Sequence, residues 1–464
     1  MSDETEPARV NAKLLPVAVI GAGFSGTMAA IQLLARLAPH RGVLLCERAE
    51  QFGRGRAYAT GNPDHLLNVR AANMSAYPDR PGHFADWLAR LDERAEPGIR
   101  VTPAGTFAAR GLYGQYLAEL LTEAVTGRDA PRLHLVNDAI VDIRREDGRL
   151  SLHSEGGRTY AAAGAVLAMG NLAAPAEPGS RYRFDPWRSD AFGRLHPHLP
   201  AMIVGTGLTM VDAVMTLRRQ GFAGRVVALS RRGLLPAAHA PAAAWPLPAL
   251  SAADTASLSA LVVRIRREIA AARAAGTDWR GVIDSLRPVT DDLWLGLPDA
   301  ERGRFLRHLR PFWDVHRHRS APTAGAAIGA EIAAGSLSVR AGRITAIEDG
   351  PSHARVTVRP RGTRGRESLD VQCILDARGI GTVAGTRDPL LSRLIGRGLV
   401  RPGPFGIGLD AAPDFSVRGG ADGPGARLWT LGPLLRGVFW ECTAVPDIRN
   451  QAAALAHAVA AELG

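Results

Sequence analysis

Two glycine-rich segments, each between a short apolar run and an apolar helical pattern, constrain the fold of this chain most strongly. The first segment is residues 21–26, after the apolar run 16–20, and the second is residues 205–210, after the run 201–204. Another apolar run follows each predicted helix, at residues 42–46 and 225–229. A strand, a glycine turn, a helix and a strand in this order are typical of a dinucleotide-binding unit. The sequence therefore predicts an α/β fold with two Rossmann-like domains.

The first glycine segment has all three glycines of the dinucleotide fingerprint. Gly21 permits a tight turn, Gly23 lets a pyrophosphate approach the backbone, and Gly26 allows close packing of helix against strand. The N-terminus of the following helix supplies free N–H groups for the phosphates. Glu47, at the end of the next apolar run, can accept hydrogen bonds from a ribose diol. This unit is therefore expected to bind an adenosine dinucleotide that lacks a 2′-phosphate.

The second segment keeps Gly205 and Gly207 but has Met210 in place of the third glycine. Its strand end also differs, because Ser230 stands where an acid would be and Arg231 and Arg232 follow it. An acid would repel a 2′-phosphate, whereas serine and arginine bind one. This pattern favours NADPH. The alternative is that the two arginines belong to a solvated surface.

A flavin-type site and an NADPH-type site in one chain imply hydride transfer from NADPH to FAD. The expected FAD domain has a first part at residues 16–195 and a second part at 379–464. The expected NADPH domain covers residues 196–378 and includes a helical insertion at about 240–320, where a proline-interrupted pattern contains an amphipathic helix over 258–274. Residues 331–377 alternate like strands. Residues 1–15 are expected to be a disordered lead-in.

Composition disfavours several other classes of protein. Cys46, Cys373 and Cys442 are far apart and form neither a CxxC pair nor a zinc spacing, so we expect no metal site and no redox dithiol. The polar N-terminus lacks the apolar core of a secretory signal, and the apolar runs are too broken to span a bilayer, which favours a cytoplasmic protein. The formal charge of +11 is carried almost entirely by arginine. It favours a compositional bias over a nucleic-acid surface.

Together the motifs resemble a bacterial group of FAD/NAD(P)-binding proteins related to flavin-containing and amino-acid N-hydroxylating monooxygenases. The resemblance rests on residues 19–26, 52–58, 65–70, 73–78, 110–114, 205–212, 310–319 and 432–441. It implies FAD contacts at Gly21, Gly23, Phe24, Ser25, Gly26, Glu47, Arg48, Asn68, Val69, Met74, Gly432 and Pro433. It implies NADPH contacts at Gly205, Gly207, Leu208, Thr209, Asp212, Ser230, Arg231 and Arg232.

The resemblance also implies a reaction. Molecular oxygen would react with the reduced flavin, and the flavin hydroperoxide would oxygenate the nitrogen of a small amine or an acidic amino acid. One alternative is an NADPH-dependent flavin reductase or oxidase that releases hydrogen peroxide. Another is a non-catalytic flavoprotein that senses nucleotides or binds nucleic acid. The oligomeric state is open.

Five residues are candidates for the reaction itself. Arg317 and Arg319 are expected to pair with an anionic substrate group. Asn73 either donates near the flavin or caps a loop, and Arg436 and Trp440 either approach the flavin or belong to the core and a surface ion pair. Arg304, Arg307, His308 and Arg310 lie at near-helical spacing, and they form either part of the anionic pocket or a solvated basic face.

Overall fold

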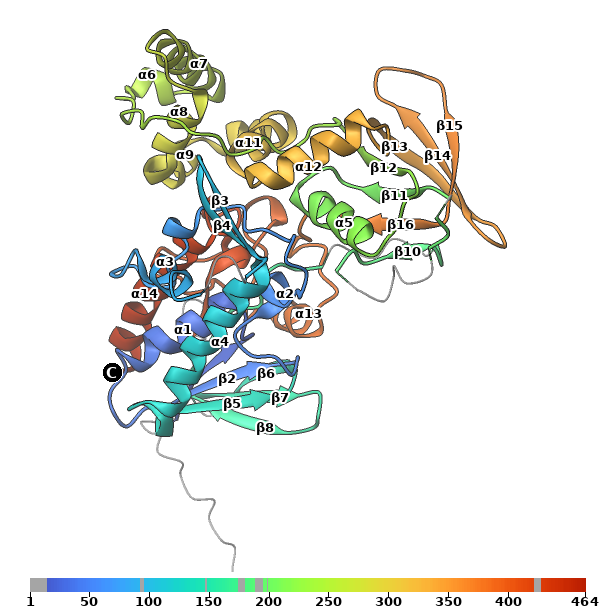
Figure 1. Ribbon diagram of the computed structural model, residues 1–464. Helices are drawn as coiled ribbons and strands as arrows, with labels where there is room; N and C mark the ends of the chain where they lie inside the picture. Colours follow the sequence, from blue (N-terminus) through green and yellow to red (C-terminus); the bar gives the residue numbers. More distant parts are fainter. Residues whose placement is uncertain are drawn as a thin grey trace, which may run out of the picture.

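The computed structural model describes residues 15–91, 96–146, 148–173, 180–187, 195–197, 199–420 and 427–464. Of the expected disordered lead-in, residues 1–14 lie outside the described residues. Leu15 is described and is buried. The predicted α/β class is confirmed, because two separate sheets with parallel cores carry the glycine segments (Figure 1).

The first sheet is parallel and has the strand order β17-β9-β1-β2-β5. Its strands are β1 (Val17–Ile20), β2 (Val43–Glu47), β5 (Leu133–Asn137), β9 (Gly164–Leu167) and β17 (Leu428–Thr430). Helices α1 (Phe24–Leu34), α4 (Arg110–Thr126) and α14 (Val445–Leu463) lie over one face. An antiparallel layer of β6 (Ile140–Glu146), β7 (Arg149–Ser154) and β8 (Thr159–Ala162) packs with α13 (Pro389–Gly396) over the other. Burial on both faces explains why β1 is continuously apolar.

Between β2 and α4 the chain forms short elements at the upper end of this sheet. They are α2 (Gly55–Tyr58), a 3₁₀ turn (Ala71–Asn73), α3 (His83–Leu88) and the hairpin β3 (Ile99–Thr102) and β4 (Gly105–Ala108). Two more 3₁₀ turns, Pro404–Gly406 and Gly432–Leu435, come from the C-terminal part, and a third, Ala130–Arg132, precedes β5. The β3–β4 hairpin points toward the helical part of the chain (Figure 1).

The second sheet has the order β10-β16-β11-β12-β13-β14-β15. Its parallel strands are β10 (Arg183–Phe184), β11 (Ala201–Val204), β12 (Val226–Ser230), β16 (Cys373–Asp376) and the first half of β13 (Leu337–Asp349). β13 then pairs antiparallel with β14 (Ala354–Pro360), which pairs with β15 (Glu367–Val371). Helices α5 (Leu208–Arg219) and α12 (Pro322–Ala333) cover one face.

A helical insertion, residues 252–317, separates β12 from α12. It contains α6 (Ala252–Thr255), α7 (Leu258–Ala274), α8 (Trp279–Ser285), a 3₁₀ turn (Arg287–Val289), α9 (Thr290–Gly296), α10 (Asp299–Arg304), a π-helical turn (Phe305–Leu309) and α11 (Arg310–Arg317). The predicted helix 258–274 has the bounds of α7. The strand-like pattern expected from residue 331 begins too early, because α12 continues to Ala333 and Gly335, at a φ of +73°, follows its end.

Candidate functional site

The first glycine loop joins β1 to α1 and leaves no room for a side chain at two positions. Gly21 has a φ of +99°, and a Cβ there would lie 2.6 Å from the carbonyl oxygen of Ala168. A Cβ on Gly26 would lie 1.7 Å from the carbonyl oxygen of Gly21. Gly23 caps α1 in an extended conformation and points the first N–H groups of the helix into the loop. The N-terminus of α1 thus lies directly on β1, as phosphate binding requires.

The Glu47 carboxylate lies against this loop. Its Oε2 accepts a hydrogen bond from the backbone N–H of Ala22 at 2.7 Å, and its Oε1 accepts one from Ala49 at 3.1 Å. Glu47 is partly exposed at the end of β2. Each carboxylate oxygen has a second lone pair, so the side chain is held by the backbone and still has acceptors for a ribose diol.

A C-terminal segment meets the first turn of α1. Gly432 has a φ of +70°, and a Cβ there would lie 2.8 Å from Oγ of Ser25. The N–H of Gly432 donates to Oε1 of Gln451 at 3.0 Å, which ties the turn to α14. The predicted residues Gly432 and Pro433 are therefore brought to Ser25, more than 400 positions away in sequence. Phe24 is buried beside Tyr113 instead, with ring centroids 6.1 Å apart.

The second glycine loop joins β11 to α5. Gly205 has a φ of +117°, and a Cβ there would lie 2.4 Å from the carbonyl oxygen of Ala377. By contrast, nothing lies within 4 Å of a Cβ built on Gly207. Leu208 and Thr209, both half-buried, form the first turn of α5 behind this open position. The loop therefore presents backbone N–H groups and empty space where a pyrophosphate would approach.

At the end of β12 the three predicted 2′-phosphate residues have different surroundings. The Ser230 hydroxyl accepts from the N–H of Gly233 at 2.9 Å and contacts Oγ1 of Thr206 at 2.9 Å. Arg232 donates to the carbonyl oxygen of Arg307 at 3.4 Å, which ties it to the helical insertion. Arg231 is exposed and has no hydrogen-bond or ion-pair partner among the described residues. Arg231 is thus the guanidinium that remains free to bind a phosphate.

The residues predicted to lie near the flavin have mixed surroundings. Met74 is buried in the core under the first sheet, and Val69 packs against that core. Asn68 is half-buried, and Asn73 is exposed on the 3₁₀ turn. Arg48 is exposed and forms an ion pair with Asp388 at 3.3 Å. Of these side chains, Asn68 and Asn73 have polar groups that remain open to a ligand.

Asp212 lies in a buried junction between the two sheets. Its Oδ2 is 3.2 Å from Nη2 of Arg110, the first residue of α4. Nε2 of His65 lies 3.0 Å from the carbonyl oxygen of Asp212 and 2.7 Å from Oγ1 of Thr216 on the next turn of α5. Burial raises the pKa of Asp212, and the charge of Arg110 opposes this shift. The structure thus gives Asp212 protein partners that hold α5 against α4.

Arg317, Arg436 and Trp440 lie where the helical insertion meets the C-terminal part. Arg317, which was expected to pair with an anionic substrate group, is buried and donates instead to Oε2 of Glu441 at 3.0 Å, so the anion that it contacts in the structure is a protein carboxylate. Trp440 packs on Trp294 with ring centroids 4.8 Å apart, and Arg436 is buried over the Trp440 ring. Among the two alternatives for Trp440, these contacts match a core tryptophan.

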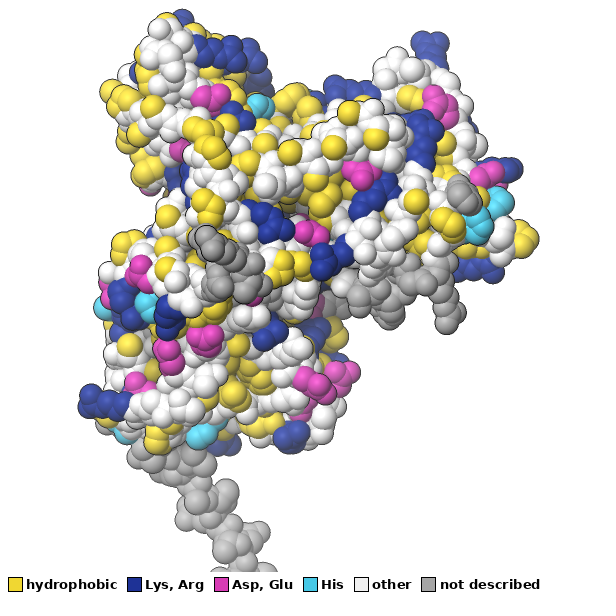
Figure 2. All heavy atoms as spheres, viewed as in Figure 1, with side chains coloured by type: hydrophobic (Ala, Val, Ile, Leu, Met, Phe, Trp, Pro, Cys, Tyr) yellow, Lys and Arg dark blue, Asp and Glu magenta, His cyan; other side chains and the backbone are white. Residues whose placement is uncertain are grey.

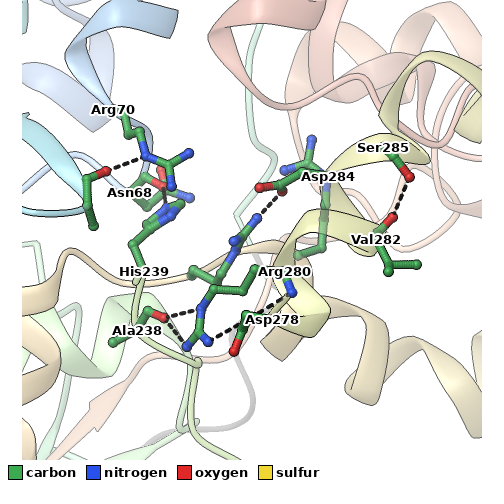
Figure 3. A network of polar contacts seen from close by, with 12 residues as sticks. Asn68, Arg70, Ala238, His239, Asp278, Arg280, Val282, Asp284 and Ser285 are labelled. Atoms are coloured by element: carbon green, nitrogen blue, oxygen red, sulfur yellow. Dashed lines mark hydrogen bonds and ion pairs between the residues drawn. The ribbon is translucent and has the colours of Figure 1, made fainter. Parts of the chain in front are cut away.

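Arg319 belongs to a polar cluster that the sequence does not indicate. It is 2% exposed and forms an ion pair with Asp284 of α8. His239 lies beside it, and Nε2 of His239 is 3.0 Å from the carbonyl oxygen of Asn68. Figure 3 shows Arg70, Asn68 and His239 together, with Asp284 on the opposite side. Arg70 lies within a recognised motif, but neither His239 nor Asp284 lies in a local pattern that would have identified it.

The near-helical basic run faces solvent at its start. Arg304, Arg307 and His308 are exposed, and Arg304 pairs with Glu301 at 2.9 Å. These surroundings favour the solvated-face alternative for the three. On the face shown in Figure 2, basic side chains are dispersed over all parts of the molecule, with acidic side chains among them.

The three cysteines are buried and free, and burial raises the pKa of Cys46 and Cys373 to about 12. The described part of the chain contains no group of three metal-ligating side chains. No helix in that part combines the length and the hydropathy needed to cross a membrane.

Comparison with known proteins shows which families and solved structures this chain resembles. Residues 18–172 match a family model described as FAD-NAD(P)-binding. The ornithine hydroxylase of Pseudomonas aeruginosa, in its reduced form, superposes with a TM-score of 0.65 at 13% identity, covering 97% of this chain and 100% of that one. The L-lysine 6-monooxygenase of Pseudomonas syringae gives 0.63 at 17% identity, with 96% and 99% covered. The thioredoxin reductase of Lactococcus lactis gives 0.52 at 12% identity, with 97% and 98% covered.

No curated protein matches the sequence. The predicted resemblance is nevertheless confirmed, for an FAD-NAD(P)-binding region at residues 18–172 and for the fold of flavin-dependent N-hydroxylases over nearly the whole chain. The same fold is shared with a bacillithiol disulfide reductase of Bacillus cereus and with the thioredoxin reductase.

Proposed function

We propose that this chain is an NADPH-dependent FAD monooxygenase that oxygenates the nitrogen of a small amine or amino acid. The observation that carries the proposal is the difference between the two strand ends beside the two glycine loops. The first carries the acid Glu47, and the second carries Ser230 and the free Arg231. Two dinucleotides that differ in a 2′-phosphate fit these ends, as FAD and NADPH do.

The two loops also fit their cofactors in shape. The open space at Gly207 and the capping position of Gly23 leave the backbone free to meet a pyrophosphate. When bound, NADPH supplies a hydride to FAD, and the reduced flavin supplies electrons to oxygen. Glu47 would hold the ribose of FAD, and Arg231 would hold the 2′-phosphate of NADPH. The buried junction of Arg110 with Asp212 would keep the two loops in a fixed relation.

The helical insertion packs an apolar cluster against the C-terminal part, and we infer that this cluster shields the site where oxygen reacts. Trp294, Phe305 and Trp440 form a closed apolar cluster between the insertion and the C-terminal part. Exclusion of water is what an oxygen-transferring site needs to prevent loss of the activated oxygen as peroxide. Relatives with a similar fold include hydroxylases of ornithine and lysine, which is the basis for proposing a nitrogen nucleophile.

Cofactor choice tests the assignment of the two sites. With FAD bound and oxygen excluded, NADPH is expected to bleach the visible absorbance of the flavin. In the Arg231→Ala variant the KM for NADPH should rise about 10- to 100-fold, because a charge-assisted hydrogen bond contributes about 1.5–3 kcal/mol. The KM for NADH should change little. Arg307→Ala, which removes a nearby exposed charge, is the matched control. Equal effects of Arg231→Ala on both nucleotides would contradict the 2′-phosphate assignment.

A further inference from the structure

Two short segments pair beside Asn68 and bring two buried polar side chains together. The N–H of His239 donates to the carbonyl oxygen of Ser320, and the N–H of Ser320 donates to that of Ala237, both at 2.9 Å. This pairing joins the segment after β12 to the end of α11. His239 is 9% exposed and Arg319 is 2% exposed. The Ala238–Ser320 bridge places His239 and Arg319 next to each other on the two paired segments, and both side chains are buried there.

Both side chains have hydrogen-bonding atoms that the protein leaves unused. Arg319 pairs with Asp284 through Nη2, whereas its Nε and Nη1 have no partner among the described residues. The same holds for Nδ1 of His239, although its Nε2 is bonded to Asn68. A buried donor or acceptor without a partner costs about 1–3 kcal/mol, and more when it is charged. Three such atoms in one cluster indicate that a ligand completes the hydrogen bonding.

The chemistry of the cluster defines what that ligand must offer. The carbonyl oxygen of Asn68 can only accept, so Nε2 of His239 carries the ring proton and Nδ1 is an acceptor. Burial lowers the pKa of His239 to about 4, which keeps the imidazole uncharged at neutral pH. Arg70 and Arg319 are positive and Asp284 is negative, while the adjacent Arg317 is paired with Glu441. The cluster therefore has one positive charge in excess and one unused acceptor.

Arg70 connects the cluster with the surface. Its Nε donates to the carbonyl oxygen of Ala104 at 2.5 Å, and its guanidinium lines a cleft of about 460 Å³ between the β3–β4 turn and the helical insertion. Opposite Arg70 the cleft is lined by residues 241–243 and 276–278, among them Asp278, whose carboxylate pairs with Arg280 at 2.9 Å. Arg319 and His239 are buried and do not line the cleft themselves. The cleft gives a small polar molecule a way to reach Arg70.

We propose that Arg319, Arg70 and His239 form the substrate-recognition site, in which the two guanidinium groups bind a carboxylate and Nδ1 of His239 accepts a hydrogen bond from the substrate amine. The assignment of the bound molecule as a substrate rests on the proposed function, whereas its recognition does not. The ligand class is an amine that also carries a carboxylate. His239 is a positioning residue here, because its hydrogen bond orients the nitrogen and leaves the chemistry to the cofactor.

Equilibrium binding to the oxidised, FAD-loaded protein without NADPH tests this site independently of turnover. The probes are two matched pairs: L-ornithine with 1,4-diaminobutane, and L-aspartate with 3-aminopropanoate. The first pair tests whether binding requires one carboxylate on the amine. The second pair tests whether two carboxylates give a higher affinity than one. We expect at least one amino acid to bind about tenfold or more tightly than its decarboxylated partner, as loss of one charge-assisted hydrogen bond predicts.

Variants separate the two halves of the site. Arg70→Gln should weaken binding of L-ornithine about tenfold or more and leave that of 1,4-diaminobutane, which has no carboxylate, unchanged, whereas Arg70→Lys should recover part of the loss. His239→Phe keeps a flat ring but removes the acceptor, so it should weaken both members of a pair by the same factor. Arg266→Gln, an exposed site on α7, is the control for loss of charge alone. Arg70 is only half-buried, so its variant tests the site even where a change at Arg319 prevents folding.

The possible outcomes test the recognition site and the proposed oxygenation reaction separately. Equal affinity within both pairs, equal losses in Arg70→Gln for L-ornithine and 1,4-diaminobutane, or no binding of any of the four probes overturns the recognition site. Selective binding through Arg70 without any N-oxygenated product leaves the site standing and rejects the proposed reaction. Oxygenation of both members of a pair at equal KM retains the reaction and rejects the site.

Discussion

Replacement of Gly26 by alanine is expected to yield a destabilised protein that does not retain FAD. The new Cβ would lie 1.7 Å from the carbonyl oxygen of Gly21 and 3.3 Å from Cβ of Ala168. The first of these atoms belongs to the backbone of the glycine loop, so no side-chain rotation relieves the clash. Overpacking in a core costs about 1–3 kcal/mol and occasionally more, and a backbone clash belongs at the upper end. α1 must move away from β1, and the loop at its N-terminus then loses its shape.

The measurement is the FAD content of the purified variant, together with its urea midpoint. Gly207→Ala is the matched control, because nothing lies within 4 Å of the added Cβ and its φ of −86° suits any residue. That control should keep the stability and FAD content of the parent protein and raise the KM for NADPH. A Gly26→Ala protein with normal FAD content and stability would contradict the account of the first loop.

Replacement of Asp212 by alanine is expected to cost about 3 kcal/mol of unfolding free energy, because removal of one partner leaves the other charge buried and unpaired. Arg110 and Asp212 have 13% and 8% of their side-chain surfaces exposed, and their atoms approach to 3.2 Å. The pair lies next to the bonds of His65 with α5. Its loss should therefore also loosen the contact between the two sheets and slow flavin reduction by bound NADPH.

Urea unfolding and the anaerobic reduction rate at saturating NADPH measure the two effects. Asp64→Ala is the control in the same junction. Asp64 pairs with Arg219 at 3.1 Å and with Arg100 at 3.5 Å, but these arginines are 53% and 32% exposed, and exposed pairs contribute about 0–1 kcal/mol. If Asp212→Ala matched Asp64→Ala in both stability and reduction rate, the buried junction would have no role in holding the domains.

The two glycine loops and their neighbouring strands can be predicted from short sequence patterns. A strand, a glycine turn, a helix and the next strand are encoded within 31 residues at β1 to Glu47 and 30 residues at β11 to Ser230, so both loops and both strand ends are predictable. The second glycine segment, given as residues 205–210, overlaps the helix, because Gly207 is the extended N-cap and α5 begins at Leu208. In that case the turn geometry determines the boundary, and the apolar pattern does not.

The recognition site and the junction depend on long-range packing. His239 and Arg319 meet because two segments 80 residues apart form a single bridge, and Asp284 reaches them from a third element. Nothing in the spacing of these residues signals this contact. Asp212 lies in a recognised motif, and the motif suggests a cofactor contact, whereas the partner that the structure supplies is Arg110 of α4. Trp440 likewise contacts Trp294 only because the helical insertion folds against the C-terminal part.

The fate of oxygen distinguishes a monooxygenase from an oxidase. The FAD-loaded protein is mixed with limiting NADPH, air and each amine of the two probe pairs, and N-hydroxylated product and hydrogen peroxide are quantified against the NADPH consumed. We expect that one amino acid gives product in near-equal amount to NADPH, with little peroxide, and that its decarboxylated partner gives less product. Peroxide equal to the NADPH consumed with every amine, and no hydroxylated nitrogen, would contradict this expectation.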